Sequence, residues 1–388
     1  MYSRLPNNMS LRNYVGILIM KRFIPWQVGL LFFCMMALLS TSCVSPQDEN
    51  IDIDLPNSFR HSINIKELVS KPEWIQLDSI PQASIGDATR IIEHDGRIYI
   101  LDLSSRKDVL VFDKDGKFLN SVGIQGKGAG EYSDIVDFAV NTDTGDVAIL
   151  SPPSTVFLYN REGGFIKSVK LSESLLWNII YSGGRYICST NHQTYTEGDE
   201  AFLIYTFSSD FQFEGKYLPV LPQQMPGTFM FEGLLSSQGD TAYYMDMFTR
   251  SLYKIGNDGV PVLLFGFSLP NPMPTSEFAK GIEFCMQPSQ KDWIRSFLPL
   301  PDSFMLTYFV GGNLNMANLS KGGEIKTCGL LSGILFKMFP ADNGSILSPV
   351  SRELYLTDWL GKPIEELTAK DLEGNFMLLR WRPNENLK

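Results

Sequence analysis

Three aspartates lie within or directly after apolar stretches that are typical of β-strands, namely Asp102, Asp137 and Asp246. If the ends of these stretches meet in the folded chain, the three carboxylates could form an acidic ring that binds a divalent cation or a sugar. An enzyme that acts on sugars or lactones could use the same carboxylates in catalysis. Acids at strand ends are more often solvated, so the sequence leaves these interpretations open.

The longest polar stretch in the body of the chain, residues 191–200, contains His192 and Tyr195. We expect this stretch to be a contact surface for a ligand, because loops carry a large share of binding residues. The other two histidines, His61 and His94, lie ahead of the first repeat and beside an Asp-Gly turn. A zinc site of three histidines is therefore not indicated. No Gly-x-Ser-x-Gly motif of a hydrolase is present either.

Residues 141–146 begin like an oxygen-rich calcium loop, with Asn141, Asp143 and Asp146. The complete loop needs a bidentate glutamate at its twelfth position, where this chain has Pro152. The sequence favours a hairpin turn in which these side chains bond to nearby backbone, with calcium as the weaker alternative. We predict no other cofactor.

The N-terminal 42 residues contain four basic residues and no acidic residue. Met20-Lys21-Arg22 precedes a mainly apolar run from Phe23 to Leu39, and small polar residues follow at 40–42. This order is that of a secretory signal peptide. The run has 17 residues, which is short for a membrane-spanning helix of about 20 residues. We expect residues 1–42 to be removed on export, with residues 1–19 lying upstream of a translation start at Met20.

Cys43 follows the small residues and resembles the cysteine of a bacterial lipobox, which is acylated and becomes the new N-terminus. The usual leucine three residues earlier is replaced by Ser40. We expect acylated Cys43 to anchor the protein in a lipid bilayer, because each buried CH₂ contributes about 0.8 kcal/mol. A soluble protein cut near Ser42 is the alternative. The polar stretch 44–50 resembles the acidic signal that sends some Bacteroidetes lipoproteins to the outer surface, so the expected location is the outer membrane, on either face.

The charge of the chain is unevenly distributed. The net charge over 388 residues is −10, but the residues after position 42 hold 29 basic and 43 acidic side chains, a net charge of −14. Nucleic-acid binding depends on basic residues that neutralise phosphates. A nucleic-acid partner is therefore not expected.

Short β-rich stretches separated by turn signals begin near Trp74. The spacing from Gly96 to Gly145 is 49 residues and that from Gly116 to Gly163 is 47 residues, so the repeat period is just under 50. A period of this length with four strands per repeat is typical of a β-propeller. Each blade must stack on its neighbours to bury both faces of its sheet.

We predict an all-β fold, a six-bladed β-propeller with short helical insertions, at residues 73–388. A lipidated cysteine and flexible tether precede it at residues 43–72. Seven blades are the alternative, since residues 74–388 hold about six and a half periods. Two helix-like segments, at 276–294 and 358–372, reduce the number to six. Strands at 74–77 and 376–381 should pair in one terminal blade and so protect two exposed edges.

The segment Gly126-Lys127-Gly128-Ala129-Gly130-Glu131-Tyr132 is the most distinctive passage. It resembles the Gly-x-Gly-Pro-Gly-Glu-Tyr segment of six-bladed β-propeller lipoproteins of Bacteroides, which are similar to NHL-repeat propellers; Ala129 replaces the usual proline. The resemblance implies a linker between two blades and extends from about Glu73 to Val169. A dinucleotide-binding turn is disfavoured because a strand, not a helix, follows the glycines.

Two functions follow from these observations. The first is a binding module on a lipid tether that presents one face to a glycan, peptide or protein partner, with no catalytic residues identified. The second is a propeller enzyme, a sugar or lactone hydrolase or lyase, that uses the three carboxylates and a divalent cation. The resemblance indicates the fold and the location of the protein. It does not distinguish the two functions, because the activity of most relatives is not assigned.

Overall fold

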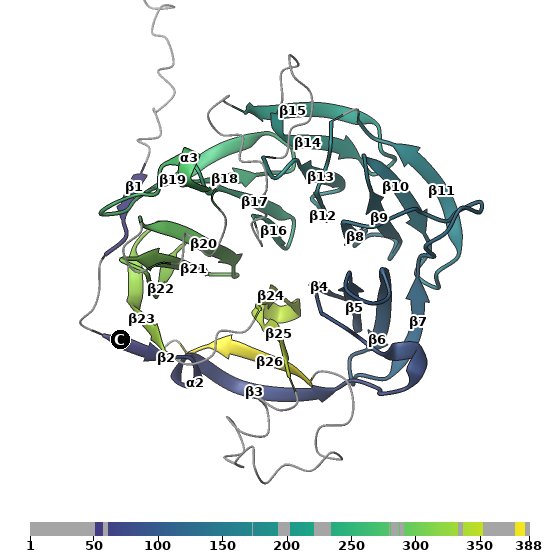
Figure 1. Cartoon of the computed structure of the whole chain (residues 1–388), viewed down its shortest axis with the longest axis horizontal. Coiled ribbons are helices and arrows are strands. Elements are labelled where there is room, and N and C mark those ends of the chain that lie inside the picture. Colours follow the sequence, from purple (N-terminus) through teal and green to yellow (C-terminus); the bar gives the residue numbers. More distant parts are fainter. Residues whose placement is uncertain are drawn as a thin grey trace, which may run out of the picture. The chain divides into compact units, whose positions relative to one another are not determined.

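The computed structural model describes residues 51–56, 61–172, 174–192, 202–220, 234–278, 280, 287, 291–332, 337–351 and 377–384. These residues form six sheets of mainly antiparallel strands around a common axis, as in a six-bladed β-propeller (Figure 1). The prediction of six blades is therefore confirmed and the alternative of seven is wrong. The only helices among the described residues are short, namely α2 (Ile65–Leu68), α3 (Thr275–Phe278) and two single 3₁₀ turns.

The blades occur in the order of the sequence. Within each of blades 1 to 5, the first strand is the innermost and the fourth strand lies toward the outside. Blades 1 to 3 consist of β4 (Arg90–His94), β5 (Arg97–Asp102), β6 (Asp108–Asp113) and β7 (Phe118–Val122); β8 (Asp137–Val140), β9 (Val147–Ser151), β10 (Thr155–Tyr159) and β11 (Phe165–Lys170); and β12 (Asn178–Ser182), β13 (Arg185–Ser189), β14 (Phe202–Ser208) and β15 (Phe213–Pro219). Blades 4 and 5 contain β16 (Leu235–Gln238), β17 (Thr241–Asp246), β18 (Ser251–Ile255) and β19 (Pro261–Ser268); and β20 (Trp293–Pro299), β21 (Ser303–Val310), β22 (Asn313–Ser320) and β23 (Ile325–Ser332).

Blade 6 is built from both ends of the described chain. Its strands are β24 (Phe339–Pro340), β25 (Ile346–Val350), β26 (Met377–Pro383) and, outermost, β3 (Val69–Gln76). β26 and β3 are antiparallel, with Leu379 opposite Trp74. The predicted closure of the ring is confirmed. It pairs the last described strand, β26, on both of its edges.

One turn geometry explains the repeat seen in the sequence. After the third strand of blades 1, 2, 3 and 5, a short polar side chain accepts a hydrogen bond from the backbone N–H four residues later. These side chains are Asp113, Asn160, Ser208 and Ser320. In blades 1 and 2 the turn also needs a glycine in the left-handed region, Gly116 (φ 90°) and Gly163 (φ 88°). The Asp-x-x-Gly and Asn-x-x-Gly signals are thus required by the backbone.

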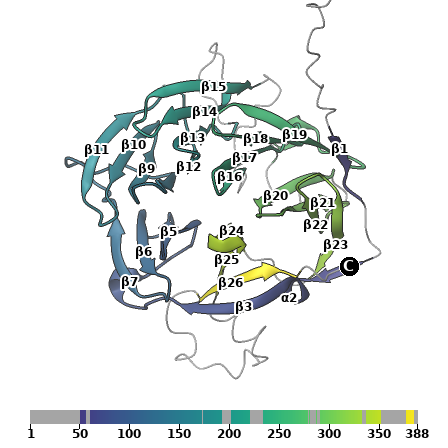
Figure 2. The same cartoon turned by 180° about the vertical axis from the view of Figure 1, so that it is seen from behind.

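The segment before β3 runs along the outside of the ring (Figure 2). β1 (Ile51–Asp54) is parallel to β19, and β2 (Ser62–Asn64) is parallel to β23, so each adds a fifth strand to its blade. Both strands fall in the range 43–72 expected to hold the tether. The ordered structure thus begins before residue 73, the expected start of the propeller.

Only the two ends of the helix expected at 276–294 and a few residues between them lie among the described residues. α3 covers Thr275–Phe278, whereas Trp293 and Ile294 begin β20. The ring of Trp293 stacks on Phe309 at 5.0 Å between centroids, which explains why these apolar residues join a sheet. The segment 358–372, the signal peptide and Cys43 lie outside the described residues. Within the part of the chain that the structure describes, no helix has the length and apolar character needed to cross a membrane.

Candidate functional site

The predicted acids lie at one end of the ring, which we call the upper face. It is the end at which the innermost strand of each blade begins and the second strand ends. The pairs Arg90–Leu101, Asp137–Leu150 and Asn178–Ser189 show this arrangement in blades 1, 2 and 3. Because the blades repeat around one axis, the innermost strand ends of neighbouring blades meet at this face (Figure 1).

Asp102, the last residue of β5, is fully buried and holds a local turn together. Its carboxylate accepts hydrogen bonds from the N–H of Gly86 (2.7 Å) and from the N–H and hydroxyl groups of Ser104 and Ser105 (2.6–3.1 Å). Burial alone would raise the pKa of Asp102, but these hydrogen bonds outweigh it and lower the pKa to about 2. All of these hydrogen bonds stabilise the fold.

Asp137, the first residue of β8, connects three blades. Its carboxylate forms an ion pair with Arg90 of β4 and accepts a hydrogen bond from the N–H of Ile179 in β12 at 2.9 Å. Arg90 also donates to the carbonyl oxygen of Ile179 at 3.0 Å, and its guanidinium lies 5.9 Å from the ring centre of Phe138. The Asp137 carboxylate is therefore fully engaged by neighbouring blades.

Asp246, the last residue of β17, pairs with His192 of blade 3. The distance from His192 Nε2 to Asp246 Oδ1 is 3.2 Å, and both side chains are almost completely buried. Burial raises the pKa of Asp246, but its hydrogen bond to His192 and those to Thr249 and Phe248 bring the net pKa below its usual value. From the sequence, His192 is predicted as a loop contact residue and Asp246 as a strand-end acid. The structure brings the two side chains together.

At the upper-face end of blade 3, three buried polar atoms have no hydrogen-bond partner among the described residues. They are Trp177 Nε1, Asn191 Oδ1 and His192 Nδ1. Trp177 directly precedes β12 and donates its backbone N–H to Ser189 at the end of β13, so all three belong to the upper-face end of this blade. A buried polar atom without a partner costs about 1–3 kcal/mol, and native proteins contain few of them.

Asn191 and His192 are also unusual in their backbone. Their φ angles are 48° and 58°, so two consecutive residues other than glycine adopt the left-handed conformation. Such a conformation costs about 1–2 kcal/mol per residue. Strained backbone and unpartnered polar atoms at the same place point to a functional site, because folding alone would select against both.

The three acids do not form one ring. Asp102 and Asp246 occupy the same strand position in blades 1 and 4, on opposite sides of the axis (Figure 1), and Asp137 is held by Arg90. Within the described ranges, no group of three or more His, Cys, Asp or Glu side chains is placed to hold a metal ion. The predicted contact residue Tyr195 lies outside these ranges.

The segment 141–146 is a hairpin turn between β8 and β9. Asn141 Oδ1 accepts hydrogen bonds from the N–H groups of Asp143 (2.9 Å) and Thr144 (3.3 Å). Asp143 accepts a further hydrogen bond from the hydroxyl of Tyr181 at 2.5 Å. These side chains bond to the chain itself, as the favoured interpretation of this segment predicts.

The Gly-x-Gly-x-Gly segment is the linker from β7 to β8, as the resemblance implies. The Glu131 carboxylate folds back to accept the N–H of Gly128 at 2.7 Å. A Cβ atom at Gly126 would lie 2.0 Å from the same carboxylate. The hydroxyl of Tyr132 donates to Lys107 O at 2.6 Å, which ties the linker to blade 1. The glycines therefore serve a compact turn rather than a phosphate.

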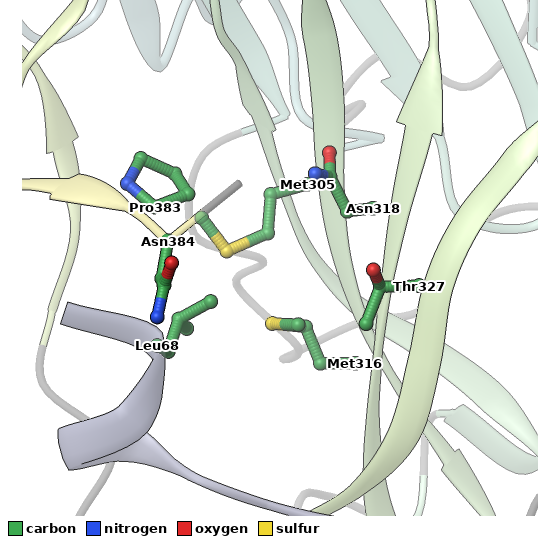
Figure 3. A pocket seen from close by; sticks show the side chains of 7 residues that line it. All are labelled: Leu68, Met305, Met316, Asn318, Thr327, Pro383 and Asn384. Carbon is green, nitrogen blue, oxygen red and sulfur yellow. The ribbon is translucent and has the colours of Figure 1, made fainter. Parts of the chain in front are cut away.

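A separate small pocket lies between blade 5 and the closing segment (Figure 3). It is lined by Met305, Met316 and Asn318 of blade 5 and by Leu68 and Asn384 on the other side. The Oδ1 atom of Asn318 is buried without a partner there. The cavity volume of about 10 Å³ admits one water molecule at most, so the pocket is too small for an organic ligand.

Sequence reasoning missed Arg90 as a site residue, whereas Asn191 is the first residue of the predicted contact stretch 191–200. Arg90 and Asp137 are 47 residues apart, which is one repeat period, so opposite charges at equivalent positions of adjacent repeats could have revealed the pair. The sequence did not indicate that Asn191 is buried or that its backbone has a positive φ.

Comparison with known proteins supports the fold. A family model described as Domain of unknown function (DUF4934) matches residues 49–359. A Bacteroides fragilis protein named for its expected export has a TM-score of 0.67 and 16% identity, over 86% of this chain and 99% of that chain. A Bacteroides vulgatus member of the DUF4221 family has a TM-score of 0.54 and 8% identity, over 81% and 97% of the two chains. No curated protein matches. At these identities the structures show the fold alone, and the NHL-repeat likeness stays a prediction.

Proposed function

The chain belongs to the DUF4934 family, whose model spans most of its length, and we propose that it is a lipid-anchored binding module that holds a glycan at its upper face. The observation that carries the proposal is the set of unpartnered buried atoms on blade 3: Trp177 Nε1, Asn191 Oδ1 and His192 Nδ1. Export is supported by the Bacteroides fragilis relative in structure, and the anchor at Cys43 by the sequence pattern.

The chemistry of these atoms fits hydroxyl groups. The indole N–H of Trp177 only donates and the amide oxygen of Asn191 only accepts. Because Nε2 of His192 donates to the Asp246 carboxylate, Nδ1 of the neutral ring is an acceptor. A sugar hydroxyl both donates and accepts, so two neighbouring hydroxyls of one ring satisfy such a mixed set. The half-buried indole of Trp177 also offers an aromatic face for stacking.

The neighbouring side chains give this cluster a rigid support. His192 is fixed by Asp246 through Nε2 and packs edge-on against Phe248, with 4.3 Å between ring centres. Asn178, the first residue of β12, accepts a hydrogen bond from Ser189 Oγ at 3.1 Å. A ligand that reaches these buried groups would therefore find them already oriented, which lowers the entropy cost of binding.

The test is glycan-array binding by the full-length protein in detergent, followed by calorimetry on the sugars that bind. Asn191→Gly and Trp177→Phe should each weaken binding at least tenfold while the unfolding temperature stays unchanged or rises, since glycine relieves the positive φ at 191. Asn343→Gly is the matched control, because Asn343 has a φ of 56° but lies exposed on blade 6. Absence of glycan binding, binding of peptides instead, or wild-type affinity in both variants would refute the proposal.

A further inference from the structure

Two arginines meet at the lower face of the ring, which is the end opposite the upper face, where the second strand of a blade begins and its third strand ends. Arg97 is the first residue of β5 in blade 1, and Arg161 lies in the turn after β10 in the adjacent blade 2 (Figure 1). Arg97 Nη1 donates to the carbonyl oxygen of Arg161 at 2.8 Å, and Arg161 Nη2 donates to the Asp95 carboxylate at 3.0 Å. Each guanidinium is thus held in place through one terminal nitrogen.

A further nitrogen of each arginine faces the same exposed carboxylate oxygen. Glu162 Oε1 lies 3.7 Å from Arg97 Nη2 and 4.0 Å from Arg161 Nε. Both distances are too long for a hydrogen bond, and the Glu162 side chain is 67% exposed, so the ion pairs are weak. Arg161 Nε is itself buried without a hydrogen-bond partner among the described residues. Two positive groups therefore face a place that this carboxylate fills only loosely.

The buried hydroxyl of Tyr99 lies close to both arginines. The side chain is fully buried among residues of blades 1 and 2, and its hydroxyl has no hydrogen-bond partner within the described part of the chain. Burial raises the pKa of Tyr99, and the charges of Arg97 and Arg161 oppose this only in part. The hydroxyl therefore stays protonated at neutral pH and can donate a hydrogen bond to an anion.

The junction of blades 3 and 4 has a related arrangement without these features. Arg185 also begins a second strand and donates to the carbonyl oxygen of a turn residue, Asn257. Here the guanidinium has a hydrogen-bonded acid, with Glu214 Oε2 at 2.7 Å from Nη1. In the place of Tyr99, blade 3 has Ile187, which carries no polar group. This junction therefore has a single arginine, and an acid is hydrogen-bonded to it.

The junction of blades 4 and 5 repeats the tyrosine but not the two arginines. Lys321 takes the turn position of Arg161, whereas the uncharged Thr241 takes the position of Arg97. Lys321 Nζ lies 3.5 Å from the hydroxyl of Tyr243, the equivalent tyrosine. The tyrosine hydroxyl therefore has a polar partner at this junction.

The other three junctions also lack a second cationic side chain. The two positions hold Val147 and Ser209 between blades 2 and 3, and Ile346 and Lys114 between blades 6 and 1. Between blades 5 and 6 the turn does not exist, because β26 and β3 come from opposite ends of the described chain. Among the described residues, only the junction of blades 1 and 2 combines two cationic side chains with an unpartnered tyrosine hydroxyl.

We propose that the junction of blades 1 and 2 binds a phosphate or sulfate group at the lower face, held by Arg97, Arg161 and the hydroxyl of Tyr99. A tetrahedral oxyanion has more acceptor oxygens than a carboxylate, so one group can accept hydrogen bonds from both guanidinium groups and from the phenol. Glu162 turns into solvent when the anion enters, since its carboxylate has only the two long ion pairs to lose.

The site is separate from the proposed glycan site. It lies at the opposite end of the ring and uses none of the three unpartnered groups of blade 3 at the upper face. The charges of the two arginines are balanced by Asp95 and Glu162 in the empty site. Once Glu162 has turned away, one positive charge is left uncompensated, which favours an anion. The proposal therefore goes beyond the proposed function, and either can fail without the other.

The experiment is calorimetric titration of the full-length protein in detergent with inorganic phosphate, inorganic sulfate and glucose 6-phosphate at low ionic strength. Arg161→Gln should weaken binding about tenfold, because it removes a charged donor. Glu162→Gln should strengthen it about threefold, because it removes a competing charge. Tyr99→Phe should weaken it about tenfold while the unfolding temperature without the anion stays unchanged or rises, since a buried hydroxyl without a partner is lost.

Arg185→Gln is the matched control, because it removes an arginine at the same strand position in blade 3 and should leave the affinity unchanged. Tighter binding of glucose 6-phosphate than of the inorganic ions would identify a phosphate ester as the ligand, and equal affinities a free anion; both outcomes support the site. Failure of all three probes to bind to the wild type and to Glu162→Gln would overturn the proposal. So would equal weakening by Arg161→Gln and Arg185→Gln, or wild-type affinity in Tyr99→Phe.

Discussion

Asp137 and Arg90 form an ion pair between the innermost strands of blades 1 and 2, and blade 3 completes it through Ile179. The peptide N–H of Ile179 donates to Asp137, and its carbonyl oxygen accepts from Arg90. The side chains of Arg90 and Asp137 are 20% and 4% exposed. Three consecutive blades thus share one polar contact in which each charged group depends on the other.

The first prediction concerns this contact. Asp137→Asn should lower the free energy of unfolding by about 3 kcal/mol, because removal of one partner leaves a buried charge without compensation. Urea denaturation measures the loss. The control is Lys114→Ala, which removes an exposed ion pair with Asp115 and should leave the free energy of unfolding almost unchanged. Equal losses in the two variants would contradict a linking role for Asp137.

The second prediction concerns acid stability. Since hydrogen bonds lower the pKa of Asp102 from 3.8 to about 2, its carboxylate stabilises the folded state above pH 3.8, and this contribution disappears as the pH falls through about 2. At neutral pH, Asp102→Asn should therefore destabilise the protein by about 1–3 kcal/mol. The gap to the wild type should close between pH 4 and pH 2 in a series of denaturation curves. A gap independent of pH would show that the charge of Asp102 plays no part.

The turns explain why the fold was predictable from the sequence. Each turn signal, such as Asp113 with Gly116 or Asn160 with Gly163, is a local backbone requirement, and the polar side chain of this turn recurs in blades 1, 2, 3 and 5. The period therefore revealed the number of blades. β1 was not foreseen, because its sequence Ile-Asp-Ile-Asp is acidic and short. Only pairing with β19, more than 200 residues away, makes it a strand.

The candidate site was less predictable because its contacts cross between blades. The apolar strands around Asp137 and Asp246 identified both as strand-end acids. Their partners, Arg90 and His192, are 47 and 54 residues distant along the chain; the first separation matches the repeat period, but nothing in the period joins His192 to Asp246. The unpartnered atoms of Asn191 and His192 depend on burial, which is a property of the assembled ring.

The third prediction concerns the linker between blades 1 and 2. At Gly123 the φ is 91°, and an added Cβ would lie 2.4 Å from Ile149 Cδ1 and 2.7 Å from the ring of Tyr132. Gly123→Ala should cost about 2–4 kcal/mol, the sum of backbone strain and overpacking. Gly96→Ala is the matched control, because its φ is 69° but no atom lies within 4 Å of the added Cβ. It should lose only the strain of about 1 kcal/mol. Thermal denaturation compares the two, and similar losses would refute the steric part.

The fourth prediction concerns the anchor. If Cys43 is acylated after cleavage of residues 1–42, Cys43→Ala should move the protein from the membrane fraction to the soluble fraction, because the acyl chains provide the stable attachment. Palmitate labelling of the wild type, and its loss in the variant, tests the same bond directly. Cys328→Ala is the control, since this half-buried cysteine of β23 is far along the chain from the cleavage point. It should keep both the label and the membrane fraction. Unchanged fractionation of Cys43→Ala would show that another element attaches the protein, and the lipid-anchored part of the proposed function would then be wrong while glycan binding at the upper face could still hold.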